Sequence, residues 1–290
     1  MADIYLRATD PVASSPHRKP APSSSGIPLT FSYAPSSDGT DENILILLHG
    51  LGDSHLPFAK LGQSVNLPQT AVLALRAPEQ IPYLYEQAFQ WYSSFDPLGD
   101  IIEHPNPTPA LELIAKVLNH LTTDCTWPPN RIHIFGFGQG GSVAAESALA
   151  WWKRELARAR MKSRIEEVNK GEKDCGAPSN SEDVQVPRSL GSVVSVSGPL
   201  LSYSTLDTPC QTPLLLFHRA SLAKGAFTSF SKGFVRAQEI VKSDGQGEES
   251  MPCSRDEWQP VMQFWSEALG RRMGDGLYEV TGDTMYSLGR

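Results

Sequence analysis

Residues 131–150, RIHIFGFGQGGSVAAESALA, combine an apolar run, a cluster of glycines and a helical pattern in one short stretch. Within it, Gly136-Phe-Gly138-Gln-Gly140-Gly141 fits two kinds of chemistry. As G-x-G-x-x-G, it is the turn that holds a dinucleotide pyrophosphate at a helix N-terminus. As G-x-S-x-G with Gly138 in place of the serine, it is the sharp turn that lifts a nucleophile above a sheet.

The dinucleotide interpretation requires a second strand soon after the turn, ending in Asp or Glu about 20 residues on. The matching region, WWKRELARARMKSRIEE, is basic and helical, and the next apolar strand begins only near residue 193. A G-x-G-x-x-G pattern without its acidic partner is a weak signal, so the sequence favours the nucleophile turn.

Elements of two kinds alternate along the chain and would position this turn. Continuous apolar runs of strand length are typical of parallel strands buried on both faces. Such runs occupy residues 44–50, 70–78, 131–137, 191–198 and 212–218. Residues 28–35 have the pattern of an edge strand. Helical patterns occupy residues 110–121, a segment starting near 140, and 257–269. The alternation predicts an α/β fold with a mostly parallel sheet covered by helices on both faces.

Several distinctive motifs follow one another along the chain: ILILLHGLGDSHLPFAKL, LRAPEQ, QWYSSFD, IHIFGFGQGGSVAAESAL and, more loosely, LGSVVSVSGPLL with PLLLFH. In this order they resemble the phospholipase/carboxylesterase branch of the α/β-hydrolases, the family of the acyl-protein thioesterases. The resemblance implies an α/β-hydrolase fold. It also implies a serine that attacks an acyl ester or thioester, a histidine that takes its proton, and an aspartate that orients the histidine.

None of these three roles is filled at its matching position. Gly138 stands at the nucleophile position, Leu222 lies near the acid position, and Cys253 stands at the histidine position. The chain has seven histidines, and none follows His218. The resemblance therefore predicts a catalytically degenerate member that acts as a binding or scaffold protein.

An active ester or thioester hydrolase with displaced residues is the alternative. Ser142 or Cys253 would then be the nucleophile, with Arg255 as the one evident helper for the thiol and Asp207 as a substitute acid. His218 matches a family position at a strand end, where a core or supporting role is favoured.

The parts of the motif that bind rather than react are retained. The HGLGD loop at residues 49–53 and the amide of Gln139 match the two halves of an oxyanion hole, which places Leu51 and Gln139 among the substrate-binding residues. Trp91 matches a family tryptophan and, with Tyr92 and Phe95, is predicted to line an acyl groove. The alternative interpretation is that these residues are kept only because they shape the backbone, in a protein without activity.

Composition divides the chain into a domain and three peripheral segments. We expect a disordered Ser/Pro-rich tail over residues 1–27, an α/β-hydrolase domain over 28–270 and a C-terminal tail over 271–290. Within the domain, residues 153–188 read as a charged, flexible insertion that begins with the basic run KRELARARMKSR.

Charge and composition limit the classes of partner that the chain is expected to bind. The net charge of −7 gives no overall attraction to nucleic acid or anionic membranes, and no apolar run is long enough to span a bilayer. The four cysteines lack C-x-x-C spacing, which favours reduced thiols in the cytoplasm and predicts no metal site or cofactor. Expected ligands are an acyl-bearing small molecule or a lipidated protein, with a further protein partner through residues 153–188.

Overall fold

A seven-stranded sheet organises the chain, with strand order β10-β9-β8-β7-β3-β4-β2. The computed structural model describes residues 4–8, 17–81, 87–171, 186–202, 206–219, 225–242, 250–272 and 278–282. The sheet strands are β2 (Phe31–Ala34), β3 (Asn43–Leu48), β4 (Thr70–Leu75), β7 (Ile132–Phe137), β8 (Ser192–Val196), β9 (Leu214–Arg219) and β10 (Ala237–Lys242). All neighbours pair in parallel except β2, which is antiparallel to β4 at one edge. The predicted mostly parallel sheet is confirmed.

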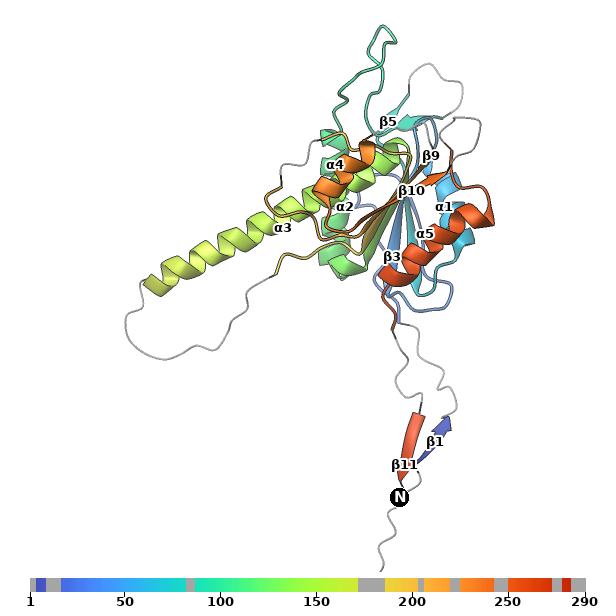
Figure 1. The fold of residues 1–290 in the computed structure, drawn as a ribbon, viewed down its shortest axis with the longest axis vertical. Coiled ribbons are helices and arrows are strands. Elements are labelled where there is room, and N and C mark those ends of the chain that lie inside the picture. Colours follow the sequence, from blue (N-terminus) through green and yellow to red (C-terminus); the bar gives the residue numbers. More distant parts are fainter. Residues whose placement is uncertain are drawn as a thin grey trace, which may run out of the picture.

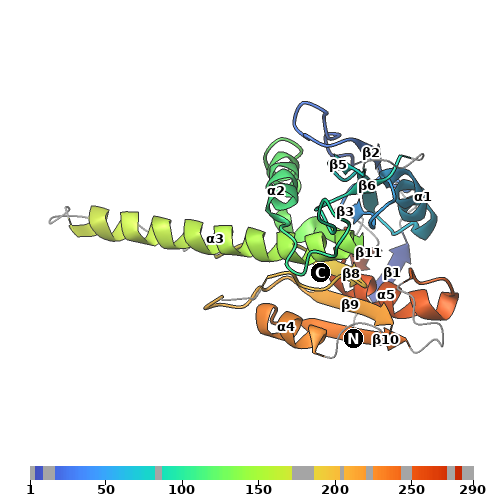
Figure 2. The same ribbon diagram turned by 90° about the horizontal axis from the view of Figure 1, so that it is seen from above.

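Helices cover both faces of this sheet (Figures 1 and 2). They are α1 (His55–Val65), α2 (Thr108–Thr123), the short 3-10 turn η1 (Pro129–Arg131), α3 (Gln139–Gly171), α4 (Ala226–Gly233) and α5 (Arg255–Ala268). Short strands β5 (Glu79–Gln80) and β6 (Phe89–Gln90) form a separate pair, as do β1 (Ile4–Ala8) and β11 (Tyr278–Gly282).

Strand β3 shows why the central strands are apolar throughout. Ile44, Ile46 and Leu48 point into the core beneath α2 and α3. Leu45 and Leu47 point into the second core beneath α1 and α5. Because successive side chains of a strand alternate between faces, only a continuous apolar run buries both sides.

Residues 17–27 correct the prediction of a tail that is disordered up to residue 27. Arg18 forms an ion pair of 3.2 Å with the buried Asp41. The Ser23 amide donates to Nε2 of His120 at 3.1 Å, and Ile27 is buried in the core. These contacts attach the segment to the domain, although its Ser/Pro-rich composition is typical of disorder.

Helix α3 continues through the first half of the predicted insertion. Its first turns pack Val143, Ala148 and Trp152 into the core, and its second half extends away from the body (Figures 1 and 2). The remainder of the predicted insertion, residues 172–185, lies outside the described residues. None of the described helices combines the length and apolar character needed to cross a bilayer.

A buried histidine in β7 should make the fold sensitive to acid. His133 is fully buried with Nδ1 2.8 Å from Ser192 Oγ, and burial lowers the pKa of His133 from 6.5 to about 3. The unfolded chain binds this proton below pH 6.5 and the folded chain does not, so stability falls as pH drops from 6.5 toward 3.

We expect this single group to contribute a slope of about 1.4 kcal/mol per pH unit in that window. Urea unfolding between pH 7 and pH 4 measures the slope. In the double variant His133→Leu/Ser192→Ala, the free energy of unfolding should depend less steeply on pH by that amount. An unchanged slope would contradict the assignment of this pH dependence to His133.

Candidate functional site

The turn between β7 and α3 has the geometry of a nucleophile elbow. Gly138 stands at its apex with φ of +52°, a region that L-residues rarely adopt. The Gly138 amide donates to the Val196 carbonyl at 2.8 Å, and its carbonyl accepts from the Ser142 amide at 3.1 Å. These two bonds fix the apex between the end of β8 and the first turn of α3.

Packing restricts the glycine positions of this turn to different degrees. A Cβ at Gly136 would lie 2.1 Å from the Gly140 carbonyl oxygen, and one at Gly140 would lie 2.4 Å from the Leu48 carbonyl oxygen. A Cβ at Gly138 meets nothing closer than the Gly50 Cα, at 3.9 Å. Packing therefore excludes side chains at Gly136 and Gly140, whereas the apex has room for one.

Two alanine substitutions separate these cases. Gly140→Ala should destabilise the protein by about 2–3 kcal/mol because backbone atoms, which cannot move cheaply, occupy the site of its Cβ. Gly138→Ala should cost only about 1 kcal/mol, from its left-handed backbone. Denaturant unfolding measures both, and equal losses would show that the apex is packed after all.

The loop at residues 49–53 lies beside the apex and is tightly held. The Ala77 amide donates to Nε2 of His49 at 2.9 Å, so Nδ1 carries the proton and donates to the Gly50 carbonyl at 2.7 Å. Burial lowers the pKa of His49, in keeping with this neutral form. The Trp91 indole N–H donates to the His49 carbonyl at 2.8 Å, and the Gly52 amide donates to the Phe89 carbonyl at 3.0 Å.

Gln139 connects the elbow to the segment after β6. Its Oε1 accepts from the Trp91 amide at 2.9 Å, and its Nε2 donates to the Tyr92 carbonyl at 2.9 Å and to Ser94 Oγ at 2.7 Å. Within the described residues, the backbone amides of Gln139 and Leu51 donate to no protein acceptor. Two backbone donors on adjoining loops are what an oxyanion hole requires.

The residues predicted to line an acyl groove divide into two groups. Leu51 and Phe95 are 42% and 52% exposed. Trp91 and Tyr92 are buried, and Trp91 is only 1% exposed. Trp91 therefore supports the HGLGD loop from beneath instead of contacting a ligand in this conformation, which corrects its expected place on the groove surface.

Ser142, one of the two displaced nucleophile candidates, lies inside the protein. It is fully buried on the first turn of α3, and its hydroxyl has no hydrogen-bond partner among the described residues. Its backbone packs against Gly198, where an added Cβ would lie 2.4 Å from the Ser142 nitrogen. This placement gives a substrate no approach to the hydroxyl.

Cys253, the other candidate, sits in a cluster that the sequence did not predict. Its thiol donates to Glu257 Oε2 at 3.4 Å and its amide donates to the same oxygen at 2.8 Å. Arg219, at the end of β9, donates from Nη1 to Glu257 Oε1 at 3.0 Å and from Nε to Ser250 Oγ at 2.6 Å. Arg219 and Glu257 are both buried.

The charge state of Glu257 bears on this cluster. The Cys253 amide and the Arg219 guanidinium lower the pKa of Glu257 to about 2. A carboxylate of that pKa is a weak base for the neighbouring thiol. The one sequence signal for its position is the S-x-x-E spacing of Ser254 and Glu257, which marks a helix N-terminus; Ser254 Oγ accepts from the Glu257 amide at 3.3 Å.

Two of the remaining predicted residues form ion pairs of their own. Leu222 lies outside the described residues. His218 pairs with Glu239 at 2.8 Å between Nε2 and Oε1, which agrees with a supporting role in the sheet. Asp207 is exposed and pairs with Arg160. No group of three or more His, Cys, Asp or Glu among the described residues is placed to hold a metal ion.

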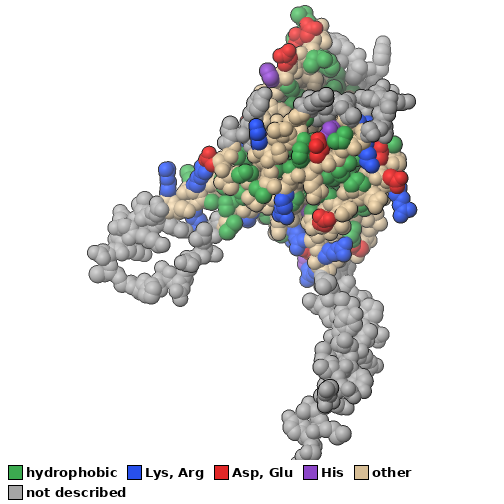
Figure 3. Space-filling view, viewed as in Figure 1, with side chains coloured by type: hydrophobic (Ala, Val, Ile, Leu, Met, Phe, Trp, Pro, Cys, Tyr) green, Lys and Arg blue, Asp and Glu red, His purple; other side chains and the backbone are tan. Residues whose placement is uncertain are grey.

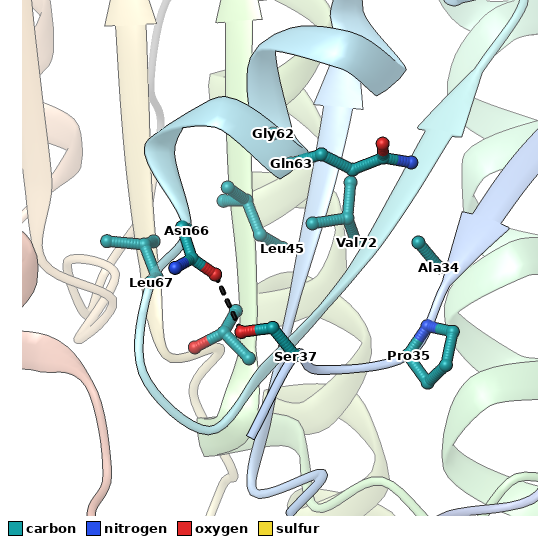
Figure 4. A pocket seen from close by; sticks show the side chains of 10 residues that line it. Ala34, Pro35, Ser37, Leu45, Gly62, Gln63, Asn66, Leu67 and Val72 are labelled. Atoms are coloured by element: carbon teal, nitrogen blue, oxygen red, sulfur yellow. Dashed lines mark hydrogen bonds between the residues drawn. The ribbon is translucent and has the colours of Figure 1, made fainter. Parts of the chain in front are cut away.

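A small cavity elsewhere is not part of this site. Figure 4 shows it between α1 and strands β3 and β4, where Ser37 Oγ donates to Asn66 Oδ1 at 2.7 Å. Thr70, which lines it, begins β4, whereas the elbow follows the carboxyl end of β7. Because these strands are parallel, the cavity and the elbow lie toward opposite ends of the sheet.

Comparisons with known proteins agree with the fold. Esterase PE8 superposes with a TM-score of 0.60 at 18% identity, covering 83% of this chain and 99% of that one. Acyl-protein thioesterase 2 of Zea mays gives a TM-score of 0.55 at 20% identity, covering 83% of this chain and 99% of that one. The fold is thus that of the α/β-hydrolases.

Sequence comparison then defines the family. The sequence profile of the phospholipase/carboxylesterase family matches residues 34–159. An uncharacterized hydrolase of Mycosarcoma maydis is 34% identical over 249 residues, which cover 84% of this chain and 82% of that protein. The chain belongs to the phospholipase/carboxylesterase family of α/β-hydrolases.

Proposed function

We propose that this chain is a catalytically degenerate member of its family, which binds an acyl-bearing small molecule or a lipidated protein without hydrolysing it. The observation that carries the proposal is the elbow itself. Gly138 occupies an apex that has room for a side chain, so the missing nucleophile is not a requirement of packing. The amides of Leu51 and Gln139 remain as donors for an acyl carbonyl.

The cluster around Cys253 supports the same proposal. A buried ion pair between Arg219 and Glu257 anchors the segment around Cys253, where the family resemblance predicts the histidine. An arrangement held by a buried, hydrogen-bonded charge pair does not release its members easily to act as acid or base.

An active hydrolase with displaced residues is the competing function. It would use Ser142 or Cys253, and the burial of Ser142 counts against the first of them. Cys253 is exposed, which keeps a thiol mechanism open to test. Cys253→Ala is the variant that removes it.

A binding assay tests the proposal directly. The probe is a fluorescent decanoyl amide, which presents an acyl carbonyl and resists hydrolysis, and anisotropy reports binding. We expect Leu51→Asp to weaken binding about tenfold, because a carboxylate at the oxyanion loop repels the carbonyl oxygen.

Leu56→Asp is the matched control, since Leu56 is also exposed and lies on α1 beyond the loop. Equal effects of the two changes, or no binding by the unmodified protein, would overturn the pocket proposal. We also propose a cytoplasmic location, which rests on the sequence alone.

A further inference from the structure

The projecting half of α3 carries a charge opposite to that of the whole chain. Residues 153–164, KRELARARMKSR, contain six Lys or Arg residues and a single Glu, whereas the net charge is −7. Figure 3 shows Lys and Arg side chains along this arm, with apolar side chains between them. A cationic arm on an acidic body is a candidate interaction surface.

The cations of the arm are not equivalent. Arg154 lies over the Trp151 ring at 5.2 Å and donates to Asn119 at 2.9 Å. Arg158 pairs with the buried Glu155 at 2.8 Å. These contacts hold the helix to itself and to α2.

Lys153, Arg160 and Arg164 form a stripe on one face, because residues at i, i+7 and i+11 of a helix lie nearly in line. All three are exposed. Arg160 reaches Asp207 at 3.4 Å, but these side chains are 65% and 84% exposed, so the pair is weak. Lys153 and Arg164 pair with no acid among the described residues.

An open groove of about 400 Å³ runs beside this stripe. Three charged residues line it, Lys153, Arg160 and Asp207. The rest of the lining is small or apolar, and consists of Leu156, Ala157 and Leu206. Leu156 and Leu206 are partly buried against the core, so they give the groove an apolar floor. The surface therefore offers cations at its rim and space for an aliphatic side chain between them.

We propose that this stripe and groove bind an acidic protein segment that carries an aliphatic anchor. Carboxylates of the partner would lie against Lys153 and Arg164, and the anchor would contact Leu156 and Leu206. An extended polyanion such as nucleic acid or an anionic membrane would also face the acidic body, which repels it. A short acidic segment contacts the arm alone, and the apolar floor adds binding that phosphates do not use.

The probe is a fluorescent 14-residue peptide with Glu and Asp on one side and two leucines at i and i+4 on the other. We expect salt-sensitive binding to the full-length protein, with about tenfold loss in Lys153→Gln/Arg164→Gln. The same peptide with both leucines changed to serine should also bind several-fold more weakly.

Arg158→Gln/Lys162→Gln is the matched control. It removes the same charge from the opposite face of the same helix, and it should change affinity by less than about threefold. Circular dichroism and elution volume verify that both variants keep their fold.

Equal losses in the two double variants would overturn the proposed face. Tighter binding of single-stranded DNA or phosphatidylserine vesicles would overturn the proposed partner class, and absence of peptide binding would overturn the proposal itself. None of these measurements involves the elbow, so they fail or succeed independently of the acyl-binding proposal.

Discussion

The double variant Gly138→Ser/Cys253→His should hydrolyse a short-chain acyl ester at least about 10²-fold faster than the unmodified protein, because a positioned base contributes roughly 10²–10⁴-fold. The apex has space for the Cβ of a serine, which would meet no atom closer than the Gly50 Cα at 3.9 Å. Position 253 lies next to Glu257, which can orient a histidine as the acid of a triad does.

The single variants are the controls for this gain. Gly138→Ser supplies a hydroxyl without a base, and Cys253→His supplies a base without a hydroxyl, so each should stay near background. Ester and thioester hydrolysis should rise together in the double variant, since both pass through an oxyanion at the same donors. Activity in Cys253→His alone would point to a different nucleophile.

Removing Arg219 should destabilise the protein by about 3–5 kcal/mol, the cost of leaving the buried Glu257 carboxylate without its guanidinium partner. Arg219→Met leaves the Glu257 carboxylate with the Cys253 amide as its main donor. Glu257→Leu removes the carboxylate that accepts from the Arg219 guanidinium and keeps the bond of Arg219 to Ser250, so its loss should be smaller. Unfolding in guanidinium chloride measures each loss.

The double variant Arg219→Met/Glu257→Leu is the matched control. It removes both charges at similar volume and should recover most of the loss, since a buried pair is often replaceable by apolar side chains. Acid has the same effect as the single change at Glu257. The pKa of Glu257 is lowered to about 2, so its contribution is present above pH 4.5 and is lost as pH falls toward 2. A double variant as unstable as the singles would mean that the pair itself stabilises the fold.

The strands at the centre of the sheet could be predicted because their local sequence is apolar throughout, which indicates burial on both faces. Runs such as Ile44–Leu48 leave no polar face, and glycines mark the turn from β7 to α3. Strand β10 was not predicted. It lies at the sheet edge, and its sequence Ala237–Lys242 alternates between partly buried and exposed residues without a continuous apolar run.

Other parts of the site depend on contacts between distant residues. Arg219 and Glu257 are 38 positions apart, and neither residue type signals burial on its own. The attachment of residues 17–27 likewise depends on Asp41 and His120, which composition does not reveal. Trp91 was predicted to line an acyl groove, and only its burial and its indole hydrogen bond to the His49 carbonyl show that it faces inward.

The most direct test of the central proposal is labelling of the unmodified protein with a fluorophosphonate probe, read by intact-protein mass spectrometry. An elbow with glycine at its apex has no activated serine, so we predict no adduct under conditions that label Gly138→Ser/Cys253→His. A stoichiometric adduct on the unmodified protein would contradict the account, because it would require an activated nucleophile elsewhere in the chain.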